Sequence, residues 1–97
     1  MVKHLVAFRF KPEISEVDRS RLLRELNELP RRFPNMQRWS LGKNISRRDS
    51  TFPYALVVEF GTEALLLEYL NSAEHESFAA ERFQPLIESR AIVDFEV

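Results

Sequence analysis

Hydrophobic and polar residues alternate from the second residue of the chain onward, over residues 2–11. Successive side chains of a strand point to opposite faces, so this alternation predicts a strand. Its even-numbered face is hydrophobic with one polar member: Val2, His4, Val6, Phe8 and Phe10. Its odd-numbered face is hydrophobic only in the middle, at Leu5 and Ala7, which suits partial burial.

A helical spacing of hydrophobic residues follows this strand. The hydrophobic positions recur three and four residues apart, at Leu22, Leu26, Leu29 and Phe33. This spacing predicts an amphipathic helix. Ser15 is suited to cap its N-terminus, with Asp18 three residues later. Pro30 and Pro34 bracket its end, because proline cannot continue the hydrogen-bond ladder of a helix.

Most of the remaining chain divides into further strands, a loop and a short helix. We expect strands over residues 36–44, 54–60 and 91–97, a polar loop over 44–53, and a helix over 63–70 that Thr62 caps. In the first of these strands, Gln37, Trp39 and Leu41 should share one face because alternate residues do so.

The second helical region must break if its two most chemically interesting residues are to meet. Tyr69 and His75 are six residues apart, which is about 600° of rotation on one continuous helix and places them on nearly opposite sides. Asn71 is suited to cap a second helix, which we expect over residues 72–89. Pro85 should end or kink that helix.

The order of these elements is β-α-β-β-α-β, with the second helical region split. This order predicts a ferredoxin-like α+β sandwich, in which helices cover one face of a four-stranded antiparallel sheet. The other face should expose hydrophobic residues: Leu5, Ala7, Val57 and Val93 or Phe95. An exposed hydrophobic patch indicates an interface, so we expect a twofold homodimer formed through this face.

Composition narrows the class of protein. A chain of 97 residues, 44% hydrophobic and 30% charged, predicts one globular domain over residues 1–97. Fourteen basic and fifteen acidic residues are interleaved, so we expect no nucleic-acid or membrane-surface partner. The absence of cysteine excludes disulfides and thiolate chemistry. We expect no signal peptide and no membrane-spanning segment, and therefore a cytoplasmic location.

The two histidines are the main candidates for chemistry. His4 lies on a hydrophobic strand face, where burial is costly without a polar partner, and Tyr69 or His75 is the expected partner. A position in the first turn of a helix favours the neutral form of His75, while Glu74 and Glu76 oppose this effect. The alternative is that all three are structural: His4 and Tyr69 as core residues, and His75 as a helix-junction residue.

Several segments of the chain resemble one family, the stress-responsive A/B barrel (Dabb) domains, over nearly the whole sequence. The segments are Val2–Val6, Phe8–Pro12, Tyr54–Phe60, Tyr69-Leu70 with His75, and Val93–Phe95. The resemblance implies a ferredoxin-like subunit in a homodimeric α+β barrel, and most members have no established activity.

The resemblance also bears on individual residues. A plant member of the family closes a linear polyketide by intramolecular aldol condensation, and its catalytic tyrosine and histidine match Tyr69 and His75. Its first-strand histidine matches His4. The family commonly has His-Pro-x-His before the second of these histidines, where this chain has Asn71-Ser72-Ala73-Glu74-His75.

These observations lead to three hypotheses of function. In the first, a pocket between sheet and helices, lined by Val6, Phe8 and Phe78, binds a small hydrophobic or carbonyl-containing molecule. In the second, the protein is a cyclase or lyase in which His75 is the general base, Tyr69 donates to the oxyanion and His4 orients the site. In the third, the chain is a non-catalytic structural dimer.

Metal ions, cofactors and nucleic acids are not expected as partners. His4, His75 and Asp94 are residue types that bind metals, but no ligand spacing supports a site. The two glycines are isolated, which argues against a phosphate-binding loop. RNA-recognition domains share this element order, but the glycine-containing RNA-binding motif is absent.

Overall fold

The computed structural model describes residues 1–97 and has the predicted order of elements. The strands are β1 (Val2–Phe10), β2 (Gln37–Lys43), β3 (Tyr54–Phe60) and β4 (Ile87–Glu96). The helices are α1 (Glu16–Arg32), α2 (Glu63–Leu70) and α3 (Ala73–Phe78), and α3 continues into a π-helical turn (Ala79–Phe83) and a 3₁₀ turn (Gln84–Leu86). The side chain of Ser15 caps α1 by accepting from the backbone N–H of Asp18, as expected.

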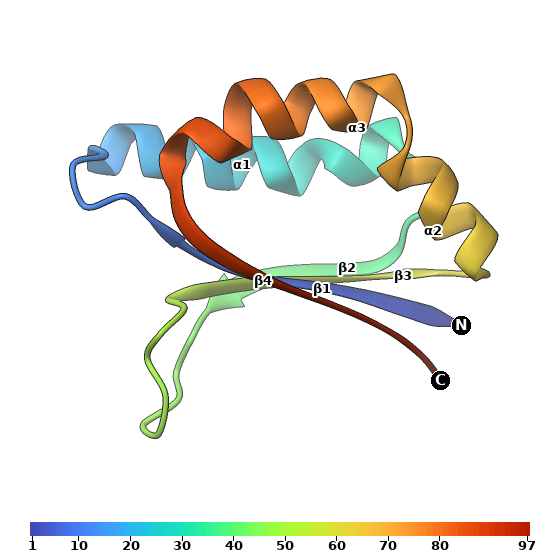
Figure 1. Ribbon diagram of the computed structural model, residues 1–97, viewed down its shortest axis with the longest axis horizontal. Helices are drawn as coiled ribbons and strands as arrows, with labels where there is room; N and C mark the ends of the chain where they lie inside the picture. Colours follow the sequence, from blue (N-terminus) through green and yellow to red (C-terminus); the bar gives the residue numbers. More distant parts are fainter.

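The four strands form one antiparallel sheet in the order β2-β3-β1-β4. Figure 1 shows the sheet nearly edge-on, with α1 and α3 side by side over one face and no helix over the other. The loop between β2 and β3 projects on the side away from the helices. This arrangement confirms the predicted ferredoxin-like α+β fold.

The core lies between the helices and the face of the sheet that they cover. Residues along β1 alternate between buried and half-buried, so its even-numbered side chains point toward the helices. Leu22, Leu26 and Leu29 of α1 are buried against them. Phe8 and Phe60 are fully buried, and burying such a side chain contributes about 1.5–3 kcal/mol. The alternation along β1 and the helical spacing of leucines in α1 therefore determine which residues form the core.

A bulge in β2 makes one prediction about that strand wrong. Gln37 pairs with Glu59, whereas Leu41 pairs with Leu56, and the register shifts between these pairs. The shift places Gln37 on the uncovered face and Leu41 on the covered face, although alternation predicts one face for both. The extra residue is Arg38, whose φ of 50° lies in the left-handed region that L-residues rarely adopt.

The end of the last helix and the start of β4 also differ from the prediction. The helical region ends at Leu86 instead of residue 89, and β4 begins at Ile87 instead of residue 91. Pro85 has no N–H to continue a helix, as the sequence indicates. Ile87 pairs with Phe10, and the Lys11 N–H donates to the Leu86 carbonyl at 2.9 Å. Sheet pairing with the end of β1 therefore replaces the last helical turn.

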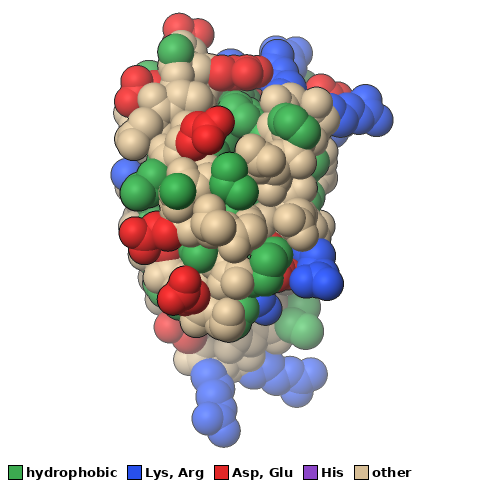
Figure 2. Space-filling model, turned by 90° about the vertical axis from the view of Figure 1, so that its right-hand side faces the viewer, with side chains coloured by type: hydrophobic (Ala, Val, Ile, Leu, Met, Phe, Trp, Pro, Cys, Tyr) green, Lys and Arg blue, Asp and Glu red, His purple; other side chains and the backbone are tan.

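The uncovered face of the sheet, hereafter the open face, carries hydrophobic side chains as predicted. Val93 is 52% exposed and Phe95 is 44% exposed, and they pair in register with Leu5 and Lys3 of β1. Elsewhere on the surface, Figure 2 shows acidic, basic and hydrophobic side chains interspersed at the end of the molecule that carries α2 and the termini. None of the helices has both the length and the hydrophobicity needed to span a bilayer.

Candidate active site

The break between α2 and α3 brings Tyr69 and His75 together. Asn71 ends α2 with helical dihedral angles, whereas Ser72 has the extended backbone of an N-cap. The prediction that Asn71 caps the second helix is therefore wrong by one residue. The Ser72 hydroxyl accepts from the His75 N–H at 3.1 Å and donates to the Tyr69 carbonyl at 2.8 Å. As a result the two rings lie 4.5 Å apart between centroids, in an edge-to-face arrangement.

Tyr69 packs against several aromatic side chains. Its side chain is buried and its ring contacts Phe33 and Phe60, with centroids at 4.7 and 5.5 Å. Burial raises the pKa of the Tyr69 phenol well above its usual value, because the phenolate would lose its hydration. The hydroxyl therefore stays protonated at neutral pH and can donate a hydrogen bond.

His75 has the properties of a neutral base. Its Nδ1–H donates to the Leu70 carbonyl at 3.1 Å, which leaves Nε2 as the acceptor nitrogen of the neutral ring. Burial lowers the pKa of His75, and the neighbouring His4 lowers it further; the Leu70 carbonyl and Glu76 act in the opposite direction. Since burial is the largest of these effects, the imidazole is favoured in its neutral form.

His4 is buried and its hydrogen-bond partner is Asp94. The Nδ1 of His4 lies 2.5 Å from Oδ1 of Asp94, the residue opposite it in register on β4. The expectation that Tyr69 or His75 would be this partner is wrong, since the Tyr69 ring approaches His4 only edge-on at 6.3 Å. Because register depends on tertiary pairing, the sequence marks Asp94 only as a carboxylate in a strand.

The three side chains line a small hydrophobic cavity, hereafter the inner cavity, of about 60 Å³ between sheet and helices. An outer groove of about 360 Å³ adjoins it between the α3 region and β4 and shares His4, Val6, His75 and Ala79 with it. No polar side-chain atom in the protein is both fully buried and unpaired. The Tyr69 hydroxyl and the Nε2 atoms of His4 and His75 have no partner in the protein, so each reaches space that solvent can enter.

Two of the three predicted pocket residues line this cavity. Val6 and Phe78 are among its walls, together with Leu26, Leu29, Trp39, Leu56 and Phe83. Phe8 lines neither the inner cavity nor the outer groove. It lies further along β1, where it stacks on Tyr54 at 5.7 Å and packs edge-on against Phe83 at 5.5 Å. Phe8 is therefore a core residue and not part of the pocket.

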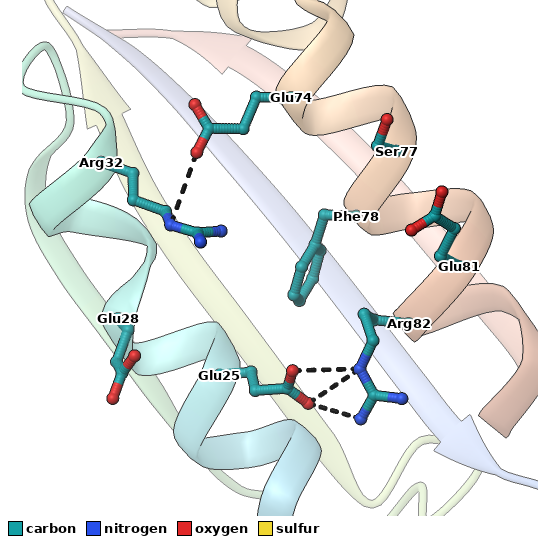
Figure 3. Close-up of a pocket in the computed structure, with 8 residues that line it drawn as sticks. All are labelled: Glu25, Glu28, Arg32, Glu74, Ser77, Phe78, Glu81 and Arg82. Carbon is teal, nitrogen blue, oxygen red and sulfur yellow. Dashed lines mark hydrogen bonds and ion pairs between the residues drawn. The ribbon is translucent and has the colours of Figure 1, made fainter.

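A separate charged groove of about 340 Å³ lies between α1 and α3 (Figure 3). Arg82 forms a two-pronged ion pair with Glu25, with the closest contact at 2.5 Å, and Arg32 lies 3.4 Å from Glu74. The Arg82 guanidinium lowers the pKa of Glu25. Phe78 projects between these two pairs, as Figure 3 shows. Most of the charged side chains here are paired with each other. These ion pairs link α1 to the α3 region, so the groove is a structural contact between the helices.

The chemistry available at the inner cavity is that of proton transfer beside a hydrogen-bond donor. A neutral imidazole accepts a proton, and a protonated phenol stabilises negative charge that develops on a nearby oxygen. No cluster of three or more histidine or carboxylate side chains is placed to hold a metal ion. The arrangement of His75 and Tyr69 therefore suits proton transfer to or from a carbonyl or hydroxyl compound.

Comparison with solved structures identifies relatives of the fold. A Dabb family protein with a ferredoxin-like fold from Mesorhizobium loti is 19% identical, with 99% of this chain and 95% of that chain covered and a TM-score of 0.88. The hydroxynitrile lyase of Passiflora edulis is 24% identical, with 99% and 92% covered and a TM-score of 0.90. A dimeric ferredoxin-like protein of unknown function from Thermobifida fusca is 19% identical, with 99% and 90% covered and a TM-score of 0.82.

At these identities the likeness concerns the fold. A search of curated proteins finds no match. The family model described as the stress responsive A/B barrel domain, however, matches residues 2–97. Since that match spans the sheet, all the helices and both histidines, the chain belongs to the stress-responsive A/B barrel (Dabb) family.

Proposed function

We propose that the protein binds a small hydrophobic carbonyl compound at the inner cavity. The observation that carries this proposal is that Tyr69, His75 and His4 line one hydrophobic cavity, and that the Tyr69 hydroxyl and both Nε2 atoms have no hydrogen-bond partner in the protein. Ligand sites are mostly hydrophobic with a few convergent polar groups that fix orientation. A carbonyl oxygen accepts from the phenol while its hydrocarbon part contacts the hydrophobic walls.

The sizes of the two spaces determine how such a ligand lies. The inner cavity, at about 60 Å³, takes a small group only, whereas the outer groove holds about 360 Å³. Ligand pockets are usually about 300–1,000 Å³ in volume. The carbonyl end therefore enters between His4 and His75, and the rest of the compound occupies the outer groove.

Titration with acetophenone, followed by NMR chemical shifts, tests this proposal. We expect saturable shifts at residues that line the cavity. Ala79 lines both spaces, so Ala79→Leu should fill them and abolish binding. Ala80 lines neither and is exposed, so Ala80→Leu is the matched control and should bind normally. Absence of binding by the wild type, or equal binding by both variants, would refute the proposal.

A second candidate function is catalysis at the same site. The favouring observation is that His75 is biased toward the neutral form with Nε2 free, beside the protonated phenol of Tyr69. His75 would remove a proton from the carbon next to the carbonyl. The C–H electron pair would form a carbon–carbon double bond, and the carbonyl electrons would move to the oxygen that Tyr69 donates to. The Passiflora edulis hydroxynitrile lyase supports this candidate only through the shared fold.

Deuterium exchange into the methyl group of acetophenone in D₂O measures this step directly. We expect His75→Gln to slow exchange about 10²-fold or more with binding retained. Tyr69→Phe should slow exchange about 10²-fold and weaken binding only by the loss of one hydrogen bond, about 1 kcal/mol. If bound acetophenone exchanges no faster than free acetophenone, the protein is a binding protein and not an enzyme of this class.

We also infer that two copies of the chain pair through the open face. The supporting observations are the exposed Val93 and Phe95 on that face and the description of the Thermobifida fusca relative as dimeric. Pairing would remove this hydrophobic surface from water. If neither ligand binding nor exchange is found, a structural dimer is the function that remains.

A further inference from the structure

We propose that Arg90 is the anchor for a carboxylate on the ligand, so that the site accepts carbonyl compounds that are also monocarboxylic acids. This inference rests on the proposed function, because it concerns the far end of the same ligand. It is carried by the position of one unpaired cation in the outer groove.

Arg90 lies on the same side of the sheet as the histidines. It pairs in register with Phe8, whose side chain points to the helices, and it lines the outer groove together with His4 and His75. β4 is an edge strand, so no further strand lies beyond it and the groove is open at this edge of the sheet. Arg90 is therefore exposed at the mouth of the groove while His4 is buried at its inner end.

The arginines of β1 and of the π-helical turn, two elements that line this groove, have carboxylate partners. Arg9 donates to Glu88 at 3.0 Å, and Arg82 pairs with Glu25. Arg90 has no ion pair and no side-chain hydrogen bond in the protein, although four further polar residues line the groove with it: His4, His75, Glu76 and Gln84. An unpaired guanidinium beside a ligand space has its five donors available, and its planar fork matches a carboxylate in a two-bond geometry.

The spacing fits a ligand of one ring. His4 pairs with Asp94 and Phe8 pairs with Arg90, so the two groups are four residues apart along the sheet. At about 3.4 Å per residue this is roughly 14 Å along the strands between backbone positions. The arginine side chain spans part of that distance. A benzene ring with a carbonyl group at one end and a carboxylate at the other occupies the remainder.

The charges in the groove favour a single negative charge on the ligand. Glu76 also lines the groove and repels anions, while Gln84 contributes an uncharged amide. One cation and one anion facing the same space leave little attraction for a dianion such as phosphate. A monocarboxylate takes both bonds from Arg90 and carries the least repulsion with Glu76.

The test compares 4-acetylbenzoate with 4-acetylbenzamide, which have the same shape and differ in charge. We expect the wild type to bind the carboxylate about tenfold or more tightly, as a charge-assisted hydrogen-bond pair allows. Arg90→Gln should reduce this preference to about one by weakening carboxylate binding only. Arg90→Lys should keep part of this preference, because the positive charge remains. It should lose the rest, because lysine lacks the planar guanidinium that forms two parallel bonds to a carboxylate.

Two further variants sharpen the result. Glu76→Gln should tighten binding of 4-acetylbenzoate and leave 4-acetylbenzamide unchanged. Arg47→Gln, in the exposed loop between β2 and β3, is the control for net charge and should change neither affinity. Equal binding of the two probes by the wild type, or stronger competition by inorganic phosphate than by benzoate, would overturn the carboxylate anchor while the carbonyl site stands. Failure of both probes to bind would overturn both proposals.

Discussion

At the scale of single residues, hydrogen bonds to ring nitrogens decide which atoms are free for chemistry. The Leu70 carbonyl occupies Nδ1 of His75, and the Asp94 carboxylate occupies Nδ1 of His4. In both rings Nε2 is the nitrogen that remains available. Neither partner is adjacent to its histidine in sequence, and Asp94 is 90 residues from His4.

The lowered pKa of His75 predicts a pH dependence of stability. The unfolded chain takes up this proton near the ordinary pKa of 6.5, whereas the folded protein takes it up at lower pH. The contribution of His75 to stability is therefore complete above pH 6.5 and is lost as pH falls toward the folded pKa. Urea unfolding of the wild type and His75→Asn at pH 5 and 7.5 measures it. The wild type should lose more stability on acidification than the variant; equal losses would contradict the shift.

The strained backbone at Arg38 predicts an unusual order of stability. With φ at 50°, a non-glycine residue pays about 1–2 kcal/mol. Both Arg38→Gly and Arg38→Ala remove the partly buried ion pair with Glu59, so comparing the two variants isolates the effect of the backbone. Arg38→Gly should be more stable than Arg38→Ala by about 1 kcal/mol, the reverse of the usual order in strands. Urea midpoints measure this difference, and a more stable alanine variant would disprove it.

At the scale of elements, the junction between α2 and α3 positions the site. Ser72 joins the end of one helix to the start of the next through bonds to Tyr69 and His75. The π-helical turn that follows places Ala79 and Phe83 on the cavity wall. Turns of this type inside helices often occur at functional sites.

Removal of this cap should affect both folding and binding. Ser72→Ala should destabilise the protein by about 1 kcal/mol, the usual cost of losing an N-cap. It should also weaken acetophenone binding, since the first turn of α3 holds His75. Ser77→Ala is the matched control, because Ser77 is exposed on the same helix and lines only the charged groove. Thermal unfolding and NMR titration give the two readouts, and equal effects of the two variants would exclude a positioning role for Ser72.

At the scale of the whole molecule, one face of the sheet is covered and the other is not. The helices bury the face that carries His4, and the open face exposes Val93 opposite Leu5. The candidate site and the inferred dimer contact therefore lie on opposite sides of the same sheet. A substitution at the candidate site therefore does not directly contact the dimer interface, and a substitution at the interface does not directly contact the site.

A charge placed in the middle of the open face should separate the dimer. Val93→Glu buries a carboxylate among hydrophobic residues if the copies remain paired, which costs several kcal/mol. The variant should sediment as a monomer at micromolar concentration, where the wild type sediments as a dimer. Ile45→Glu is the control, since Ile45 is 93% exposed in the loop between β2 and β3. A wild-type monomer would show that the open face does not pair.

The sequence alone determined the order of the elements, the covered face of β1 and the need for a break between Tyr69 and His75. These follow from local periodicity and from chain spacing, which act over a few residues. Alternation could not predict the bulge at Arg38. A single residue in a left-handed conformation places the strand residues before it on the opposite face from the one that alternation predicts. Capping preference did not distinguish Asn71 from its neighbour Ser72, since both residue types are good caps.

The tertiary structure decided the remaining features, namely Asp94 opposite His4, Phe8 outside the pocket and Arg90 at its mouth. The positions of Asp94 and Arg90 depend on the register between β1 and β4, which pairs the two ends of the chain, whereas that of Phe8 depends on its packing against Tyr54 and Phe83. That register is set by the burial of whole faces and by the pairing that begins at Ile87. The local sequence pattern predicts on which side of a strand a side chain lies. Which side chains from other strands and helices contact it is determined only when the sheet has packed.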